Sequence, residues 1–133
     1  MPDPYIHLSF LKLNVPQMAP ALEFWRSAMG FEIQDTFDEP DFLEHILAIP
    51  DQGEDGPRMM LVEFKDGRDV SIGEGHGPVG FITHDVETAL EQAVAAGAKV
   101  TMPVTEVAPR LRIAKFVSPQ GHEAELVHRV PDE

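Results

Sequence analysis

The sequence predicts an α+β protein made of two copies of a βαβββ module. The order of the expected elements, one strand, one helix and three strands, occurs twice along the 133 residues. Both expected helices contain the motif Ala-Leu-Glu, at Ala21–Glu23 and at Ala89–Glu91, ahead of a glycine that ends the helix. Each half closes with a short strand that carries a glutamate next to apolar residues, Glu63 in the first half and Glu125 in the second. A repeated unit of this kind dictates the architecture of the whole chain.

The first half begins with a strand followed by an amphipathic helix. Pro20 suits the first turn of this helix, where a missing N–H group does no harm, and Gly30 suits its C-terminal end. Apolar residues at helical spacing predict a buried stripe, which consists of Met18, Leu22, Trp25 and Met29. The expected strands of this half are Tyr5–Val15, Phe31–Phe37, Phe42–Ile49 and Met59–Lys65, with a loop over Pro50–Pro57.

A glycine-rich stretch separates the first half from the second. Asp85 is the predicted N-cap of the second helix, and Gly97 ends it. The predicted buried stripe of this helix is Val86, Leu90, Ala93 and Val94. The expected strands are Val79–Thr83, Lys99–Met102, Arg110–Val117 and His122–Val127. We therefore expect a single domain over residues 1–133, with module one at about 5–66, a linker at about 67–77 and module two at about 78–130.

Composition and charge narrow the classes of function. The chain has 43% hydrophobic and 25% charged residues, as ordinary globular proteins do, and no apolar run long enough to cross a bilayer. The N-terminus lacks the basic and apolar regions of a signal peptide, so we expect a cytosolic protein. A formal net charge of −13 disfavours nucleic acid and anionic membranes as partners, because both repel it. Without cysteine, any metal site must use His, Asp or Glu.

The strand Met59–Lys65 carries the most informative carboxylate. Side chains alternate between the two faces of a strand, so Glu63 shares its face with Met59 and Leu61. If both faces are covered, this carboxylate must be paired, metal-bound or protonated, because an unpaired buried charge is costly. The alternative is that Glu63 sits at an exposed strand end.

With these elements the chain resembles the vicinal oxygen chelate superfamily, which includes glyoxalase I, extradiol dioxygenases and the bleomycin- and fosfomycin-resistance proteins. The resemblance covers nearly the whole chain and is carried best by Phe10–Ile33, Leu61–Phe64, Asp85–Val100 and Ser118–Leu126. It implies that the two βαβββ modules form a cupped, mixed sheet. It also implies a divalent metal in the cup, bound by residues of the first and last strands of each module. Such motifs identify the fold better than the reaction, because one scaffold supports several chemistries.

The resemblance assigns Glu63 and Glu125 to the two carboxylate positions of that metal site. The other two positions, usually His or Gln, fall on Phe10 and Pro78, and neither of these can bind a metal. His76 lies two residues before Pro78 and is the candidate third ligand of a Ni²⁺, Zn²⁺ or Mn²⁺ ion. With such an ion the protein would be a lyase or isomerase acting on an oxygen-chelating substrate, and Glu125 would shuttle the proton.

A metal-free member of the same superfamily is the alternative, with a small organic molecule bound in the cup as in the bleomycin-resistance proteins. We expect Phe10, His45, Met59 and Leu61 to line this ligand cavity, and acidic walls to favour a cationic ligand. An extradiol dioxygenase ranks last, because it needs two histidines where Phe10 and Pro78 stand.

Two further expectations concern charge and assembly. Without a metal, two facing carboxylates repel, so one of them has a raised pKa or a cation such as Lys12 or Arg112 lies between them. We also expect a homodimer, because isologous dimers are the commonest assembly and the resemblance implies a cup that two chains often complete.

Overall fold

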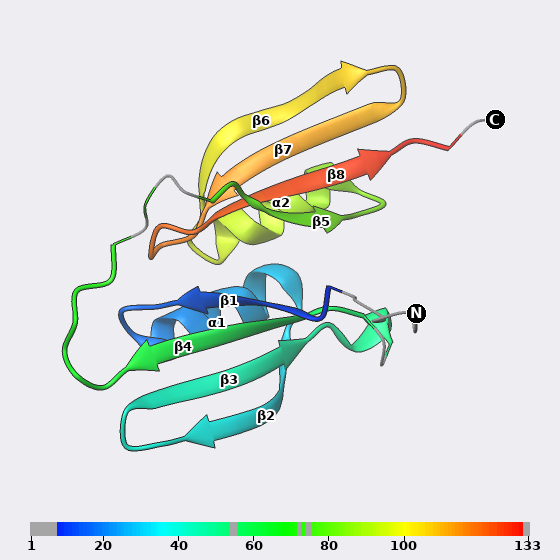
Figure 1. Cartoon of the computed structure of the whole chain (residues 1–133). Coiled ribbons are helices and arrows are strands. Elements are labelled where there is room, and N and C mark those ends of the chain that lie inside the picture. Colours follow the sequence, from blue (N-terminus) through cyan, green and yellow to red (C-terminus); the bar gives the residue numbers. More distant parts are fainter. Residues whose placement is uncertain (1–7, 54–55, 72, 74–75, 132–133) are drawn as a thin grey trace, which may run out of the picture.

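The structure, a computed structural model, describes residues 8–53, 56–71, 73 and 76–131. It contains two four-stranded mixed sheets and two α-helices, and each half of the chain forms one sheet (Figure 1). The first half, called module one, comprises β1 (Phe10–Asn14), α1 (Met18–Met29), β2 (Glu32–Asp38), β3 (Phe42–Ala48), the 3₁₀ turn η1 (Pro50–Gln52) and β4 (Arg58–Phe64). The second half, called module two, comprises β5 (Val79–Ile82), α2 (Val86–Ala95), β6 (Lys99–Ala108), β7 (Leu111–Val117) and β8 (Glu123–Arg129). The predicted α+β fold with two βαβββ units is confirmed.

The two modules have the same sheet topology. The strand order is β1-β4-β3-β2 in module one and β5-β8-β7-β6 in module two. The first strand of each module pairs in parallel with the last one, and the remaining pairs are antiparallel. β1 and β5 are therefore edge strands, and the linker that follows β4 passes from one module to the other (Figure 1).

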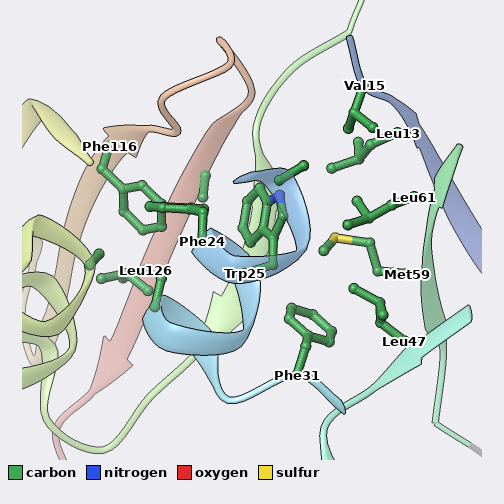
Figure 2. Packing of buried hydrophobic residues seen from close by; sticks show 14 of the residues in the cluster. Leu13, Val15, Phe24, Trp25, Phe31, Leu47, Met59, Leu61, Phe116 and Leu126 are labelled. Atoms are coloured by element: carbon green, nitrogen blue, oxygen red, sulfur yellow. The ribbon is translucent and has the colours of Figure 1, made fainter. Parts of the chain in front are cut away.

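The two modules share one hydrophobic core, in which α1 lies between the two sheets (Figure 2). The Trp25 ring of α1 is 1% exposed and packs against Phe31, Phe81 and Phe116 at centroid distances of 6.4, 6.2 and 6.5 Å. Phe24 lies 5.0 Å from Trp25 and 6.1 Å from Phe116. Since Phe81 and Phe116 belong to module two, these rings hold the modules together. Each aromatic pair adds about 0.5–1.5 kcal/mol of stability beyond what the burial of its apolar surface contributes.

Two of the helix boundaries predicted from capping residues, at Gly30 and Asp85, are confirmed. Gly30 ends α1 with a left-handed φ of 78° and donates its N–H group to the Arg26 carbonyl at 3.0 Å. Asp85 starts α2, and its carboxylate accepts hydrogen bonds from the Thr88 N–H group at 3.1 Å and the Thr88 hydroxyl at 2.7 Å. Gly30 therefore fixes where α1 ends, and Asp85 fixes where α2 begins after β5.

Other details differ from the prediction. β6 continues to Ala108 instead of ending at Met102, because its pairing with β7 is irregular around Pro103 and a proline is tolerated at such a bulge. Val94 of α2 is exposed, because it stands about 100° around the helix from the buried Ala93. The predicted start of the first strand, Tyr5, lies outside the described residues. In the described part of the chain, neither helix has the length and apolarity needed to span a membrane.

Candidate functional site

The strand registers show which residues of the two modules occupy equivalent positions. The pairing of β1 with β4 ends where the Val15 N–H group donates to the Val62 carbonyl at 2.8 Å. The pairing of β5 with β8 ends where the Thr83 N–H group donates to the Val127 carbonyl at 2.9 Å. Val62 and Val127 are therefore equivalent, and the neighbouring positions of β4 and β8 can be matched by counting from them.

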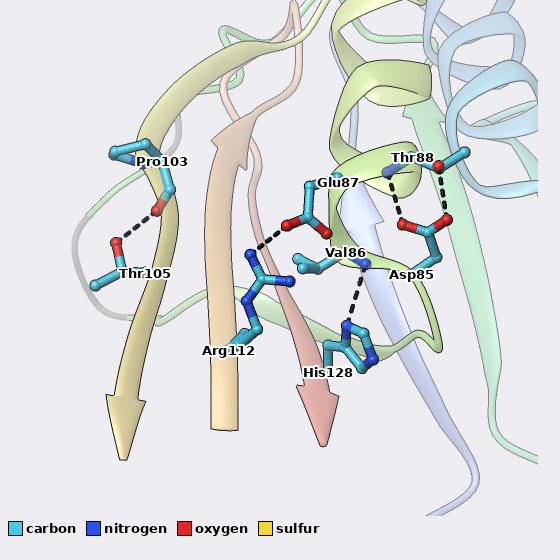
Figure 3. Close-up of polar contacts among 8 residues, drawn as sticks. All are labelled: Asp85, Val86, Glu87, Thr88, Pro103, Thr105, Arg112 and His128. Carbon is cyan, nitrogen blue, oxygen red and sulfur yellow. Dashed lines mark hydrogen bonds and ion pairs between the residues drawn. The ribbon is translucent and has the colours of Figure 1, made fainter. Parts of the chain in front are cut away.

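The residues that follow these valines, Glu63 and His128, each accept a hydrogen bond from the start of a helix. Glu63 Oε1 accepts from the Met18 N–H group at 2.5 Å. His128 Nδ1 accepts from the Val86 N–H group at 3.5 Å, as Figure 3 shows. The first N–H groups of a helix have no partner within the helix, and its positive N-terminus favours a carboxylate. Gln17, the N-cap of α1, makes no side-chain cap. Glu63 therefore caps α1 from a strand 45 residues away.

Glu125 is not the counterpart of Glu63. Counted from the same valines, its counterpart in module one is Met60. The neighbours of Glu125 along β8 are buried in the core, so its own side chain points to the other face of the sheet. On that face its Oε1 atom lies 3.7 Å from Nζ of Lys115. The two glutamates thus lie on opposite faces of equivalent sheets, one facing a helix and one facing away.

The residues present do not fit the metal that the resemblance implies. The resemblance assigns the four ligand positions to Phe10, Glu63, Pro78 and Glu125, but the strand registers make Met60, not Glu63, the counterpart of Glu125. The four equivalent positions are therefore held by Phe10, Met60, Pro78 and Glu125, which together offer one carboxylate. Ni²⁺, Zn²⁺ and Mn²⁺ sites need several nitrogen or oxygen donors. His76 is exposed in the linker. Within the described residues, no group of three or more His, Cys, Asp and Glu side chains could hold a metal ion.

The four residues expected to line a cavity lie on both faces of the module one sheet. Met59 and Leu61 are 4% and 0% exposed and belong to the core, because α1 covers their face of β4. His45 pairs with Leu61 on this same face, and its Nδ1 atom lies 2.8 Å from the Thr36 hydroxyl. Burial lowers the pKa of His45. Phe10 lies half-exposed on the opposite face of the sheet.

Neither cation expected between the two predicted carboxylates lies there. Lys12 Nζ pairs with Glu44 Oε1 at 2.9 Å on the face away from α1. Arg112 pairs with Glu87 at the start of α2 (Figure 3). Instead, Lys115 is the cation beside the second of these carboxylates. Glu44 is only 8% exposed, and the sequence gives no sign of its burial, because it follows Phe42-Leu43 in a strand with the composition of a core strand.

A crevice of about 900 Å³ lies between the two modules, beside the linker. Its walls are the end of β1 and β4, the linker, and the beginnings of β5 and β8. Its apolar lining consists of Leu11, Leu13, Phe64, Val70, Pro78 and Val79. Its polar lining includes Lys12, Asn14, Arg68, Asp69, His122 and Glu123. Of the residues predicted for a metal or cavity site, only His76 lines it within the described part of the chain.

The guanidinium of Arg68 lies over one wall of the crevice. Its central carbon is 3.7 Å from the centroid of the Phe64 ring. Asp66 holds it in a two-pronged pair, with Nη2 to Oδ2 at 2.6 Å and Nε to Oδ1 at 3.0 Å. The hydrogen bonds from Arg68 lower the pKa of Asp66 to about 2. The pair therefore stays charged at neutral pH.

His122 lines the crevice and connects the two modules. The residue is 6% exposed, and its Nε2 atom lies 3.1 Å from the Asn14 carbonyl oxygen. Only a ring N–H can bond to a carbonyl, so Nε2 carries the hydrogen and Nδ1 is left as an acceptor. Nδ1 is buried without a partner among the described residues. Burial lowers the pKa of His122, so the ring is neutral at pH 7.

The sequence contains few signals that could have located this crevice. Nothing in the pattern around His122 distinguishes it from a surface histidine. Its ring contacts the Asn14 carbonyl at the end of β1, 108 residues away, from the turn that precedes β8. The glycine-rich linker has the composition of a simple connection, although its described residues supply a large part of the lining.

Comparison with known proteins identifies the superfamily to which this architecture belongs. The sequence model of the Glyoxalase/Bleomycin resistance protein/Dioxygenase superfamily matches residues 7–126. None of the curated proteins compared with the chain matches it. A mutant glyoxalase I from Zea mays is similar in structure, with a TM-score of 0.81 at 22% identity over 92% of this chain and 46% of the maize chain. This chain thus spans about half the length of the maize enzyme.

Two other solved structures match over nearly their whole length. A glyoxalase family protein from Bacillus cereus has a TM-score of 0.82 at 13% identity, over 97% of both chains. A mutant of the fosfomycin resistance protein FosX from Listeria monocytogenes, solved with Mn(II) and 1S,2S-dihydroxypropylphosphonic acid, has a TM-score of 0.71 at 18% identity, over 94% of this chain and 90% of that one. At these identities the likeness shows the fold alone. Together with the sequence match, it shows that the chain belongs to the Glyoxalase/Bleomycin resistance protein/Dioxygenase superfamily.

Proposed function

We propose that this protein binds a small organic molecule in the crevice between its modules, as a metal-free member of its superfamily. The crevice itself is the observation that carries this proposal. Small-molecule sites are concave, have volumes of roughly 300–1,000 Å³, and combine apolar walls with a few polar groups. The crevice, with about 900 Å³ and a mixed lining, has these properties.

The donor set supports the metal-free alternative over a metal-dependent lyase. Glu63 already accepts the Met18 N–H group, and Glu125 stands beside Lys115. We therefore assign Glu125 no proton-transfer role. Ni²⁺, Zn²⁺ or Mn²⁺ should leave the unfolding temperature unchanged. A protein that binds such an ion would gain roughly 2.7 kcal/mol in free energy of unfolding at ~100 times the dissociation constant, and its unfolding temperature would rise.

A gain-of-function variant is the positive control for this metal test. Replacing Phe10 and Pro78 with His and Met60 with Glu, alongside the native Glu125, would give a donor to each of the four positions that the strand registers make equivalent. We expect metal to stabilise this triple variant and not the natural protein. Stabilisation of the natural protein that is lost in Glu125→Gln would overturn the metal-free proposal.

The crevice proposal is tested by screening a small-molecule library with protein-observed NMR. Binders should shift the amide signals of Lys12, Asn14 and Val79. Asn14→Trp places a large side chain in the crevice from an exposed strand position and should abolish binding, whereas Val107→Trp, on the exposed surface of β6, should not. Binders that shift only residues elsewhere, or that still bind Asn14→Trp, would refute the site.

We also propose that the protein works as a homodimer in which the sheet faces opposite the helices meet a second copy. Phe10 and Phe37 are each 43% exposed, and Ile82 is 81% exposed. Their strand registers place all three on the faces that the helices leave open. Sedimentation velocity should show a dimer, and Phe37→Glu should shift it toward the monomer. A monomeric natural protein would refute this assembly.

A further inference from the structure

We propose that the crevice selects an organic cation, which stacks on the Phe64 ring in the place that the Arg68 guanidinium occupies. The inference rests on the proposed binding function and specifies the class of ligand. It assigns Phe64 as the cation-binding surface, Asp69 and Glu123 as the balancing charges, and Arg68 as an internal competitor.

The contact between Arg68 and Phe64 shows that this ring accepts a cation. At 3.7 Å from the ring centroid, the guanidinium lies well within the range of about 6 Å in which a cation is attracted to an aromatic face. The Arg68 side chain is half-exposed, and its hydrogen bonds run to Asp66 within the same turn. The guanidinium can therefore leave the ring while it keeps Asp66 as its partner.

The distribution of charge in the crevice favours a positive ligand. In the described part of the chain, the crevice is lined by one lysine and one arginine, and each already has a carboxylate partner: Lys12 pairs with Glu44, and Arg68 pairs with Asp66. Of the two lining carboxylates, Asp69 makes no hydrogen bond or ion pair within the described residues, and Glu123 only accepts the Thr101 hydroxyl at 3.3 Å. His122, held neutral by burial, adds no positive charge. The crevice therefore has two carboxylates that no cation balances.

The remaining walls suit the apolar body of such a ligand. Leu11 and Val79 come from the two edge strands, and Val70 and Pro78 come from the linker and its end. Apolar walls with a few charged groups bind a molecule that has an apolar body and one charged end. The overall net charge of −13 also draws cations toward the protein and repels anions.

The test compares three probes of similar size and different charge. Benzyltrimethylammonium is the cation, benzyl alcohol is neutral and phenylacetate is an anion, each titrated into the natural protein while amide shifts are followed. We expect the cation to bind in the crevice most tightly and the anion not to bind. Equal binding of the cation and the alcohol there would overturn the cation inference and leave the binding function intact. If neither these probes nor any library compound binds in the crevice, the proposed function itself fails.

Substitutions then separate the three roles. Glu123→Gln and Asp69→Asn should each weaken binding of benzyltrimethylammonium by about two- to fivefold, the range expected for partly exposed charge pairs, while the alcohol is unaffected. Asp51→Asn removes an exposed carboxylate of η1, outside the crevice, and is the matched control. An equal loss in the control would mean that net charge alone attracts the probe.

The competitor role of Arg68 gives the most distinctive outcome. Arg68→Gln should tighten binding of the cation because it uncovers the Phe64 ring, and Phe64→Leu should remove the preference for the cation over the alcohol. Arg129→Gln makes the same change in net charge at the exposed end of β8 and should leave the affinity nearly unchanged. If Arg68→Gln has no more effect than Arg129→Gln, Arg68 is not a competitor for the ring.

Discussion

The helices α1 and α2 begin at equivalent places in the two modules but are capped in different ways. α2 has a cap of its own, since the Asp85 carboxylate accepts two hydrogen bonds from Thr88, and the remote His128 adds only a long contact of 3.5 Å. α1 follows Gln17, which supplies no side-chain cap, and takes its cap from Glu63 at 2.5 Å. A glutamate at the end of the last strand can therefore cap a helix in this fold when the helix lacks a cap of its own.

The largest expected effect concerns the core that joins the modules. Leu47 of β3 and Phe116 of β7 are equivalent, and both are 0% exposed. Phe116→Ala should cost about 3–5 kcal/mol and Leu47→Ala about 2–5 kcal/mol of unfolding free energy. We expect Phe116 to be the costlier of the pair, because its ring also contacts Phe24 and Trp25 of the other module. Urea unfolding measures both, and the reverse order would contradict a shared core.

The second effect tests the two caps directly. Glu63→Ala should lower the free energy of unfolding by about 1–2 kcal/mol, because it leaves the Met18 N–H group without its acceptor. His128→Ala should cost less than about 0.5 kcal/mol, because Asp85 still caps α2. Glu63→Gln keeps an acceptor oxygen and should lie between the two. Equal costs for Glu63→Ala and His128→Ala in urea unfolding would refute the difference in capping.

A third experiment makes module one resemble module two. Gln17 has the extended backbone of an N-cap, with φ −142° and ψ 123°, so Gln17→Ser should add a local cap and stabilise the protein by about 0.5–1 kcal/mol. The cost of Glu63→Ala should then be smaller in this background. A double-mutant cycle measures that coupling, and strictly additive effects would show that the two groups do not share the role.

The smallest effect is a dependence of stability on pH through His122, which belongs to the contact between the modules. Its pKa is lowered by burial from an ordinary value of 6.5, so the unfolded chain takes up a proton before the folded one as the pH falls. The stabilisation that comes from a neutral His122 is therefore fully present above the ordinary pKa of 6.5, and it is lost as the pH falls toward the lower pKa of the folded state. His45 acts in the same direction. His122→Gln should reduce the change in urea midpoint between about pH 7.5 and about pH 5.5. An unchanged pH profile would show that His122 does not contribute to the dependence of stability on pH.

The parts of the fold that depend on local sequence were predictable. Gly30 and Asp85 mark helix ends by their own backbone and side-chain preferences, so their positions could be inferred without tertiary structure. The site could not be inferred in the same way. Glu63 and Glu125 look alike in sequence, but Glu63 matches His128, three positions further along β8 than Glu125. An odd shift in a strand reverses the face to which a side chain points.

The repeated βαβββ order, the local helix caps at Gly30 and Asp85 and the absence of cysteine ligands follow from the sequence alone, because they depend on composition, periodicity and residues close in the chain. Only the tertiary structure shows that Glu63 and Glu125 occupy opposite faces of equivalent sheets, and that the turn before β8 meets the end of β1, where His122 is buried beside the crevice. The physical reason is that strand register and contacts between modules are set by hydrogen bonds and packing over 45 to 108 residues of chain. A local sequence pattern carries no information about contacts between residues so far apart in the chain.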